Sequence, residues 1–228
     1  MSKHILMVVT SNDRLGDHGG ATGTWLEELA GAYYTFIDAG HTVSIASTRG
    51  GSAPLDPGSL QEPWLTETGR RFQHDARATA ALRDTLPIEG LKASTFDAIY
   101  LVGGAGTAWD FPASTPLTRL IEALDRSGRV VAAVCHGVLG LTTARCNHDK
   151  PLVAGRAVTG VSNAEERAIG YDKIVPLLPE ERMNQLGAQY SCAAEPFQSH
   201  VVRDGNLLTG QNPASAAPLA VEVLRALA

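Results

Sequence analysis

The chain has 228 residues, of which 44% are hydrophobic and 19% are charged, and its formal net charge is −5. This size and composition are those of a globular protein that buries a substantial core. The basic residues are scattered through an acidic chain, which argues against a nucleic-acid-binding surface.

The first half of the chain predicts two strands, a helix and a less regular segment. Short β-branched runs predict strands over 4–10 and 42–47, with a helix between them over 25–38, where apolar residues recur at helical spacing. The segment 49–92 is rich in glycine and proline, so we expect a cap or insertion there rather than a separate domain. Within it, a short helix over 79–85 is predicted.

The second half continues the alternation of strand and helix. A strand over 96–102 runs into Gly103-Gly104, and a helix follows with Thr115 as its N-cap and Pro116 at its first position. Five small apolar residues then predict a buried strand over 130–134. The remaining predicted elements are a short strand within 151–159, helices that begin at Asn163, Pro179 and Asn212, and a hairpin over 199–209 with Asp204-Gly205 at its tip.

Strands that alternate with helices predict an α/β fold. We expect a flavodoxin-like three-layer sandwich over residues 1–228, with a mostly parallel sheet, helices on both faces and a small cap insertion. Functional sites in such folds lie beyond the carboxyl ends of the strands. Three loops meet this description: the one after Thr10, the glycine-rich one after Val102 and the one at Cys135.

Cys135 is the strongest candidate for a reactive group. It follows the strand over 130–134 directly and is followed by His136 and Gly137, which gives the order strand, nucleophile, tight turn, helix. This order is typical of a nucleophile elbow, and backbone amides at the helix start favour a thiolate. The alternative is an inert buried cysteine at a strand end, a common placement for this residue type.

A catalytic thiol needs a proton partner, an orienting group and donors for an oxyanion. The backbone amides of Gly104 and His136 are candidate oxyanion donors. Gly104 is also compatible with a simple turn, and the Gly-Gly-Ala-Gly stretch is not a full dinucleotide-binding motif. Glu28 sits on the predicted first helix, where a solvated carboxylate is the alternative. Glu166 follows Asn163 by three residues, which also suits a capping box.

No cofactor, metal or membrane span is predicted. The three cysteines are far apart and show no zinc-binding spacing, and no apolar run reaches membrane-spanning length. The first residues lack the apolar region of a signal peptide, so we expect a cytoplasmic protein without a membrane or nucleic-acid partner.

Four stretches spread over nearly the whole chain carry a family resemblance. They are Thr22-Gly-Thr-Trp-Leu-Glu-Glu28-Leu, Leu101-Val-Gly-Gly-Ala-Gly-Thr-Ala-Trp-Asp-Phe-Pro112, Ala133-Val-Cys135-His136-Gly137 and Leu208-Thr-Gly-Gln-Asn-Pro-Ala-Ser-Ala216. Together they resemble the ThiJ/PfpI superfamily, also called class I glutamine amidotransferase-like. Within it they resemble the Hsp-type branch, which includes the glutathione-independent glyoxalases (glyoxalase III).

The resemblance implies a role for each candidate residue. Cys135 matches the family nucleophile, Glu28 the carboxylic acid that hydrogen-bonds this thiol, and His136 the adjacent histidine. Glu166 best matches the acidic residue that orients the histidine, with Glu165 as the alternative. Gly104 and His136 match the oxyanion donors. The resemblance also implies a homodimer.

The activity implied is a glyoxalase that converts a small carbonyl substrate, a 2-oxoaldehyde such as methylglyoxal, to a 2-hydroxy acid through a hemithioacetal on Cys135. Either Glu28 or His136 is the base in this scheme. Ala105 stands where the branch commonly has histidine, and His18 is a candidate for partly replacing it. Two alternatives stay open: a Cys-His-Glu amidase or peptidase, and a non-enzymatic stress chaperone or redox sensor.

Overall fold

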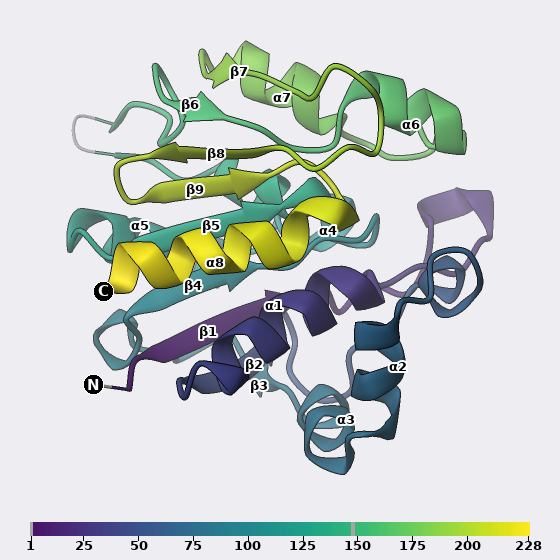
Figure 1. Cartoon of the computed structure of the whole chain (residues 1–228). Coiled ribbons are helices and arrows are strands. Elements are labelled where there is room, and N and C mark those ends of the chain that lie inside the picture. The colour runs from purple at the N-terminus through teal and green to yellow at the C-terminus, as the bar shows by residue number, and fades with distance from the viewer. Residues whose placement is uncertain (1, 147–148) are drawn as a thin grey trace.

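A central, mainly parallel sheet organises the computed structural model, which describes residues 2–146 and 149–228. Within these residues, seven strands form the main sheet in the order β3-β2-β1-β4-β5-β9-β8 (Figure 1). Neighbouring strands are parallel except for β8 and β9. The strands are β1 His4–Val9, β2 Thr42–Ser47, β3 Leu86–Pro87, β4 Ala98–Leu101, β5 Val130–Val134, β8 Val201–Asp204 and β9 Leu207–Gly210. The predicted α/β fold with a mostly parallel sheet is confirmed.

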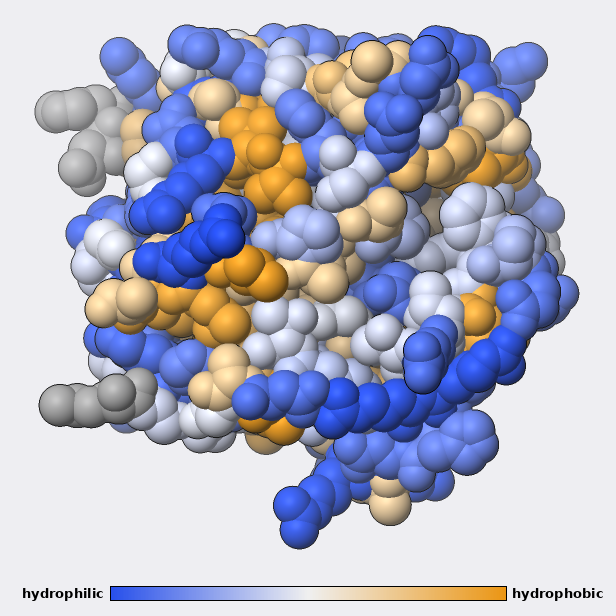
Figure 2. Space-filling view, in the orientation of Figure 1, coloured by the Kyte–Doolittle hydropathy of each residue, from blue (hydrophilic) through white to orange (hydrophobic). Residues whose placement is uncertain are grey.

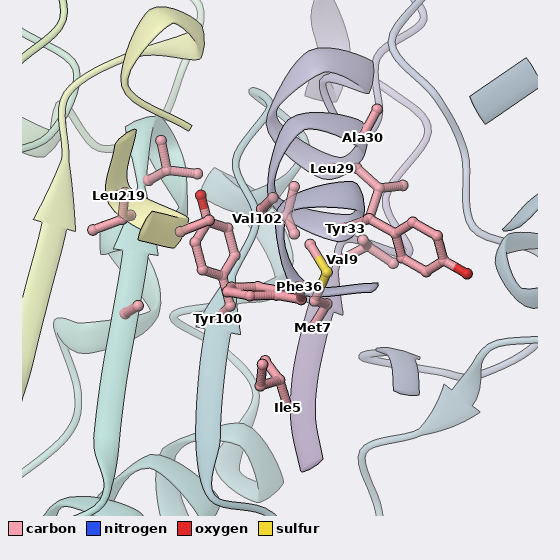
Figure 3. Close-up of a cluster of buried hydrophobic side chains, with 14 of the residues drawn as sticks. Ile5, Met7, Val9, Leu29, Ala30, Tyr33, Phe36, Tyr100, Val102 and Leu219 are labelled. Carbon is pink, nitrogen blue, oxygen red and sulfur yellow. The ribbon is translucent and has the colours of Figure 1, made fainter. Parts of the chain in front are cut away.

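Helices cover both faces of this sheet because alternate residues of the central strands point to opposite sides. Ile5 and Met7 of β1 and Tyr100 of β4 face α1 (Leu26–Asp38) and α8 (Ala216–Leu227), as Figure 3 shows. The intervening Leu6 and Ile99 face α5 (Thr115–Arg126) on the other side. The strands are therefore buried on both faces, which explains why their sequence is almost continuously apolar.

Several predicted boundaries are wrong by a residue or more. The first helix begins at Leu26, with Trp25 as its N-cap. The N-cap of α5 is Ser114, whose side chain accepts a hydrogen bond from the backbone amide of Leu117. The strand expected within 151–159 is reduced to β6 Ala157–Val158, which pairs with β7 Gln189–Tyr190 in a separate small sheet. Gly155 before it has a φ of +76°, which breaks an extended chain.

The hairpin near the C-terminus is confirmed, with Asp204 paired to Leu207 across the Gly205-Asn206 turn. Its two strands are antiparallel and extend the main sheet at one edge. The helical segments also found around the sheet are α4 Thr107–Asp110, α6 Asn163–Ile169, α7 Pro179–Gln185 and the 3₁₀ segments η1 Gly16–His18, η3 Ala93–Thr95, η4 Cys135–Leu141 and η6 Pro213–Ser215.

The segment 49–92 is more ordered than its composition indicates. It contains η2 Pro57–Leu60, α2 Glu67–His74 and α3 Ala76–Arg83, and ends with the edge strand β3. The predicted helix over 79–85 starts too late, and α2 was not predicted. Each helix has a side-chain N-cap, Thr66 for α2 and Asp75 for α3. Such caps compensate for the short length of these helices.

The face that carries α1 and α8 is largely hydrophilic (Figure 2). Hydrophobic residues gather on it over β8 and α8, where Val221 is 39% exposed. Among the described residues, none of the helices is long and apolar enough to cross a membrane.

Candidate active site

Cys135 lies at the sharp turn between β5 and η4. Its φ of +55° is one that residues other than glycine rarely adopt. The turn is tight because Gly137 lies against β4: a Cβ there would be 2.5 Å from the carbonyl oxygen of Leu101. Cys135 is 7% exposed, and it lies at the carboxyl end of the sheet. The backbone therefore has the geometry of a nucleophile elbow.

His136 connects the thiol to a buried carboxylate. Its Nδ1 lies 3.5 Å from Sγ of Cys135, and its Nε2 lies 2.7 Å from Oε1 of Glu166. In the second contact the carboxylate oxygen lies off the ring N–H axis, and the pair is an ion pair when His136 is protonated. Burial lowers the pKa of His136, but Glu166, Glu28 and Asp56 together raise it by more, so the net shift is upward.

Glu165 and Glu166 have different surroundings although they are adjacent. Glu165, not Glu166, forms the capping box of α6, and its partner is Ser162 rather than Asn163. Its two carboxylate oxygens accept hydrogen bonds from Ser162, Phe197, Gln211 and Asn212. Only Glu166 of the two contacts His136 among the ion pairs of the described residues. The capping box expected from Asn163 is wrong because the helix is capped one residue earlier.

Glu28 projects from the first turn of α1 and is fully buried. Burial raises its pKa to about 7, while the Cys135 thiol and the Gly103 amide lower it. The carboxyl lies so close to the loop after β4 that a Cβ on Gly103 would collide with Oε2. Such a carboxyl exchanges its proton near neutral pH, which suits general acid–base chemistry.

The Cys135 thiol is not stabilised as a thiolate by the elbow alone. Burial raises its pKa, and the Glu28 carboxylate raises it further. The net shift of this pKa is therefore upward with Glu28 ionised, whereas the sequence predicts a thiolate favoured by the helix-start amides. Protonation of Glu28 removes its repulsion and so lowers the pKa of the thiol, while burial still raises it.

A cavity of about 210 Å³ brings these groups together. Glu28, Cys135, His136 and the backbone of Gly104 line it, together with Ala105. Gly104 has a φ of +109° and packs against the backbone just before α1. His18 is exposed in η1 and is not among the lining residues. Glu166 contacts the cavity only through His136.

Several lining residues were missed by the sequence analysis: Trp25, Asp56, Trp64, Tyr171 and Phe197. They come from loops and helix ends that share no pattern with the Cys135 motif. Asp56 is buried, accepts a hydrogen bond from Thr22, and has its pKa raised by burial. The sequence could not single out the aromatic residues, because isolated aromatic residues are as often found in the core as in a pocket. Figure 1 shows the loops before α1 and α2 at the same end of the sheet as α6.

Within residues 2–146 and 149–228, no group of three or more His, Cys, Asp or Glu side chains is arranged to hold a metal ion.

Comparison with known proteins places the chain in a family. The model of the DJ-1/PfpI family matches residues 21–226. The chain belongs to the DJ-1/PfpI family. Its resemblance to the ThiJ/PfpI superfamily is thereby confirmed.

Several known proteins are similar to this chain over almost their whole length. Glutathione-independent glyoxalase HSP31 of Saccharomyces cerevisiae is 32% identical, over 99% of this chain and 98% of that protein. The crystal structure of glyoxalase III from Candida albicans has a TM-score of 0.91 at 25% identity, over 98% and 97% of the two chains. Rapid Encystment Protein 24 KDa of Francisella tularensis has a TM-score of 0.94 at 34% identity, over 99% of each chain.

Proposed function

We propose that this DJ-1/PfpI protein is a glutathione-independent glyoxalase that converts a 2-oxoaldehyde such as methylglyoxal to a 2-hydroxy acid. The observation that carries the proposal is the buried Cys135 thiol, with His136 Nδ1 at 3.5 Å and the Glu28 carboxyl facing the same small cavity. The names of the similar glyoxalases in yeasts support the same activity.

The chemistry begins with the thiolate of Cys135. Sγ forms a bond to the aldehyde carbon as the carbonyl π bond breaks, and the aldehyde oxygen takes the proton held by Glu28 to give a hemithioacetal. The developing oxyanion accepts hydrogen bonds from the backbone amides of Gly104 and His136 in this scheme. The partial enclosure of the cavity strengthens these interactions.

A base then moves a proton between the two carbons. It removes hydrogen from the former aldehyde carbon, an enediol forms, and a proton is returned to the former ketone carbon. The first carbon is oxidised to a thioester and the second is reduced to an alcohol, so no external redox cofactor is consumed. Water then cleaves the thioester, and the sum is methylglyoxal plus water giving lactate.

Glu28 and His136 are the two candidates for this base. Glu28 has a pKa of about 7, near working pH, which is the favourable range for proton transfer. His136 is held by Glu166, which raises its pKa and orients its ring. We propose that Glu28 carries the proton and that Glu166 positions His136 beside the thiol.

The test is lactate formation from methylglyoxal without glutathione or added metal. Wild-type protein is expected to produce lactate and Cys135→Ala to produce none. Cys192→Ala, which removes an exposed thiol, is the matched control and is expected to keep wild-type activity. Absence of turnover by folded wild-type protein, or full activity in Cys135→Ala, would contradict the proposal.

We also propose that the protein is a cytoplasmic homodimer and that the segment 49–92 caps the cavity. The cap is supported by Asp56, Gly58 and Trp64, which line the cavity from this segment.

The dimer rests on the family resemblance, and the apolar area over β8 and α8 is a candidate interface (Figure 2). Light scattering on the purified protein tests the dimer: a monomeric mass would contradict it.

A further inference from the structure

The mouth of the cavity is built from aromatic side chains. The rings of Trp25 and Trp64 meet edge to face at 5.8 Å, and Phe197 lies 5.8 Å beyond Trp64. Trp64 and Phe197 are each 37% exposed, and Ile169 beside them is 42% exposed. All four residues line the cavity that contains Cys135. Large apolar side chains left open at a pocket are typical of a surface that an apolar ligand covers.

The cavity is larger than its proposed reaction requires. An apolar protein cavity of about 150 Å³ accommodates a benzene molecule, and the cavity over Cys135 has about 210 Å³. Ala105 contributes only a methyl group to its wall. Methylglyoxal has a single methyl group beyond its two carbonyls, so it leaves the aromatic part of the cavity without a contact.

Phe197 is held in place at a backbone cost. Its φ of +64° is strained for a bulky residue. The amide of Phe197 donates a 2.8 Å hydrogen bond to Oε1 of Glu165, and that oxygen also accepts from Asn212. Glu165 is fully buried at the start of α6. Strain that is maintained by a buried network indicates a functional constraint on the position of the ring.

We propose that Trp25, Trp64 and Phe197 form a subsite for an aromatic substituent, so that the enzyme favours 2-oxoaldehydes with an aryl group over methylglyoxal. The inference rests on the proposed glyoxalase activity and specifies its substrate class. Phenylglyoxal is the simplest probe. Sγ of Cys135 adds to its aldehyde carbon, the ring occupies the subsite, and phenylglyoxal plus water gives mandelate by the same internal transfer of hydrogen.

The test compares kcat/KM for phenylglyoxal and methylglyoxal in the wild type, Trp64→Ala and Phe197→Asn. Asparagine tolerates the left-handed backbone at position 197 but removes the ring. The ratio of the two kcat/KM values, phenylglyoxal over methylglyoxal, is expected to exceed 1 in the wild type. It should fall about fivefold in each variant, the size expected for loss of an aromatic contact. Leu86→Ala is the control, because Leu86 is 41% exposed outside the cavity; its ratio should not change.

A second measurement does not depend on the reactivity of the aldehydes. Mandelate is expected to inhibit methylglyoxal turnover at lower concentration than lactate, and Trp64→Ala should remove the difference. Unchanged ratios in both variants, or equal inhibition by the two acids, would overturn the subsite while leaving the glyoxalase activity intact. If neither aldehyde yields a hydroxy acid in the folded wild type, the proposed function fails and the subsite fails with it.

Discussion

Cys135 combines a reactive side chain with a backbone conformation that disfavours any side chain. An L-residue in the left-handed region costs about 1–2 kcal/mol relative to the right-handed one, and Cys135 has a φ of +55°. Sequence alone could place Cys135 at a turn, since glycine follows it by two residues, but could not show that the cysteine itself takes the positive φ. The strain is evidence that the position of the thiol matters more than local stability.

This strain predicts an order of stability for two variants that both lack the thiol. Cys135→Gly should have a free energy of unfolding about 1 kcal/mol higher than Cys135→Ala, because glycine adopts a φ of +55° without a Cβ penalty. Urea unfolding of both proteins measures the difference. The opposite order is expected at Ala133, which lies in β5, where Ala133→Gly should destabilise relative to alanine. Equal stability of the two Cys135 variants would contradict a strained elbow.

Glu28 predicts a specific pH dependence of stability. Its pKa is about 7 in the folded protein and 4.5 without burial, so between these values the folded state holds more protons. The free energy of unfolding therefore falls as pH rises through this window, by about 3 kcal/mol in total. Glu28→Gln removes this contribution. The free energy of unfolding of the variant minus that of the wild type should therefore increase from pH 4.5 to pH 8.

Glu89→Gln is the control for Glu28→Gln, because Glu89 is exposed in a loop. Its stability difference from the wild type should stay constant over the same pH range. Denaturant unfolding at several pH values measures both differences. A flat difference for Glu28→Gln would show that Glu28 ionises in the folded protein as it does in water.

Glu165 and Glu166 predict two separable effects from the same chemical change. Glu166→Gln removes the charge 2.7 Å from Nε2 of His136, so the pKa of His136 should fall, as NMR titration of its ring protons would measure. Glu165→Gln leaves buried donors facing an amide, and should lower the free energy of unfolding by about 2–4 kcal/mol. If Glu165→Gln shifts the His136 titration and Glu166→Gln does not, the two roles are reversed.

At the scale of elements, the site depends on the close approach of the β4 loop to α1 and to the elbow. A Cβ on Gly103 would collide with Glu28 and lie 2.9 Å from Cβ of Cys135. Gly103→Ala should therefore abolish lactate formation, because the two groups must move apart. Gly128→Ala is the control: its Cβ would meet nothing within 4 Å, although its φ is +70°. It should cost about 1–2 kcal/mol of stability and leave activity unchanged.

The elements that could be predicted are those whose sequence pattern is set by the sheet. β1, β4 and β5 are buried on both faces, so their apolar runs were unmistakable, and the motif at Cys135 followed from the strand before it. Short elements such as α2 and β7 are held by caps and tertiary contacts rather than by periodicity. For the same reason the aromatic mouth was missed: Trp25, Trp64 and Phe197 meet only in the folded chain.

At the scale of the whole molecule, the segment 49–92 contributes Asp56, Gly58 and Trp64 to the cavity that contains the thiol. Asp56 accepts a hydrogen bond from Thr22, and Trp64 of the same segment contacts Trp25. These contacts narrow the approach to Cys135, a residue that is only 7% exposed. A Cys-His-Glu set is also compatible with amide hydrolysis, but a peptide needs an open groove that extends on both sides of the nucleophile.

The narrowed approach to the cavity therefore predicts that the protein is not an efficient amidase. Fluorogenic aminoacyl amides are expected to be hydrolysed by the wild type no faster than by Cys135→Ala, under conditions where the wild type converts methylglyoxal. The two assays use one preparation, so a folding defect would abolish both. Cleavage of the amides that depends on Cys135 and increases in Trp64→Ala would show that the mouth limits access to a hydrolase. Cleavage without methylglyoxal turnover would assign the Cys135–His136–Glu166 set to amide chemistry instead, since the same contacts orient the thiol for either carbonyl.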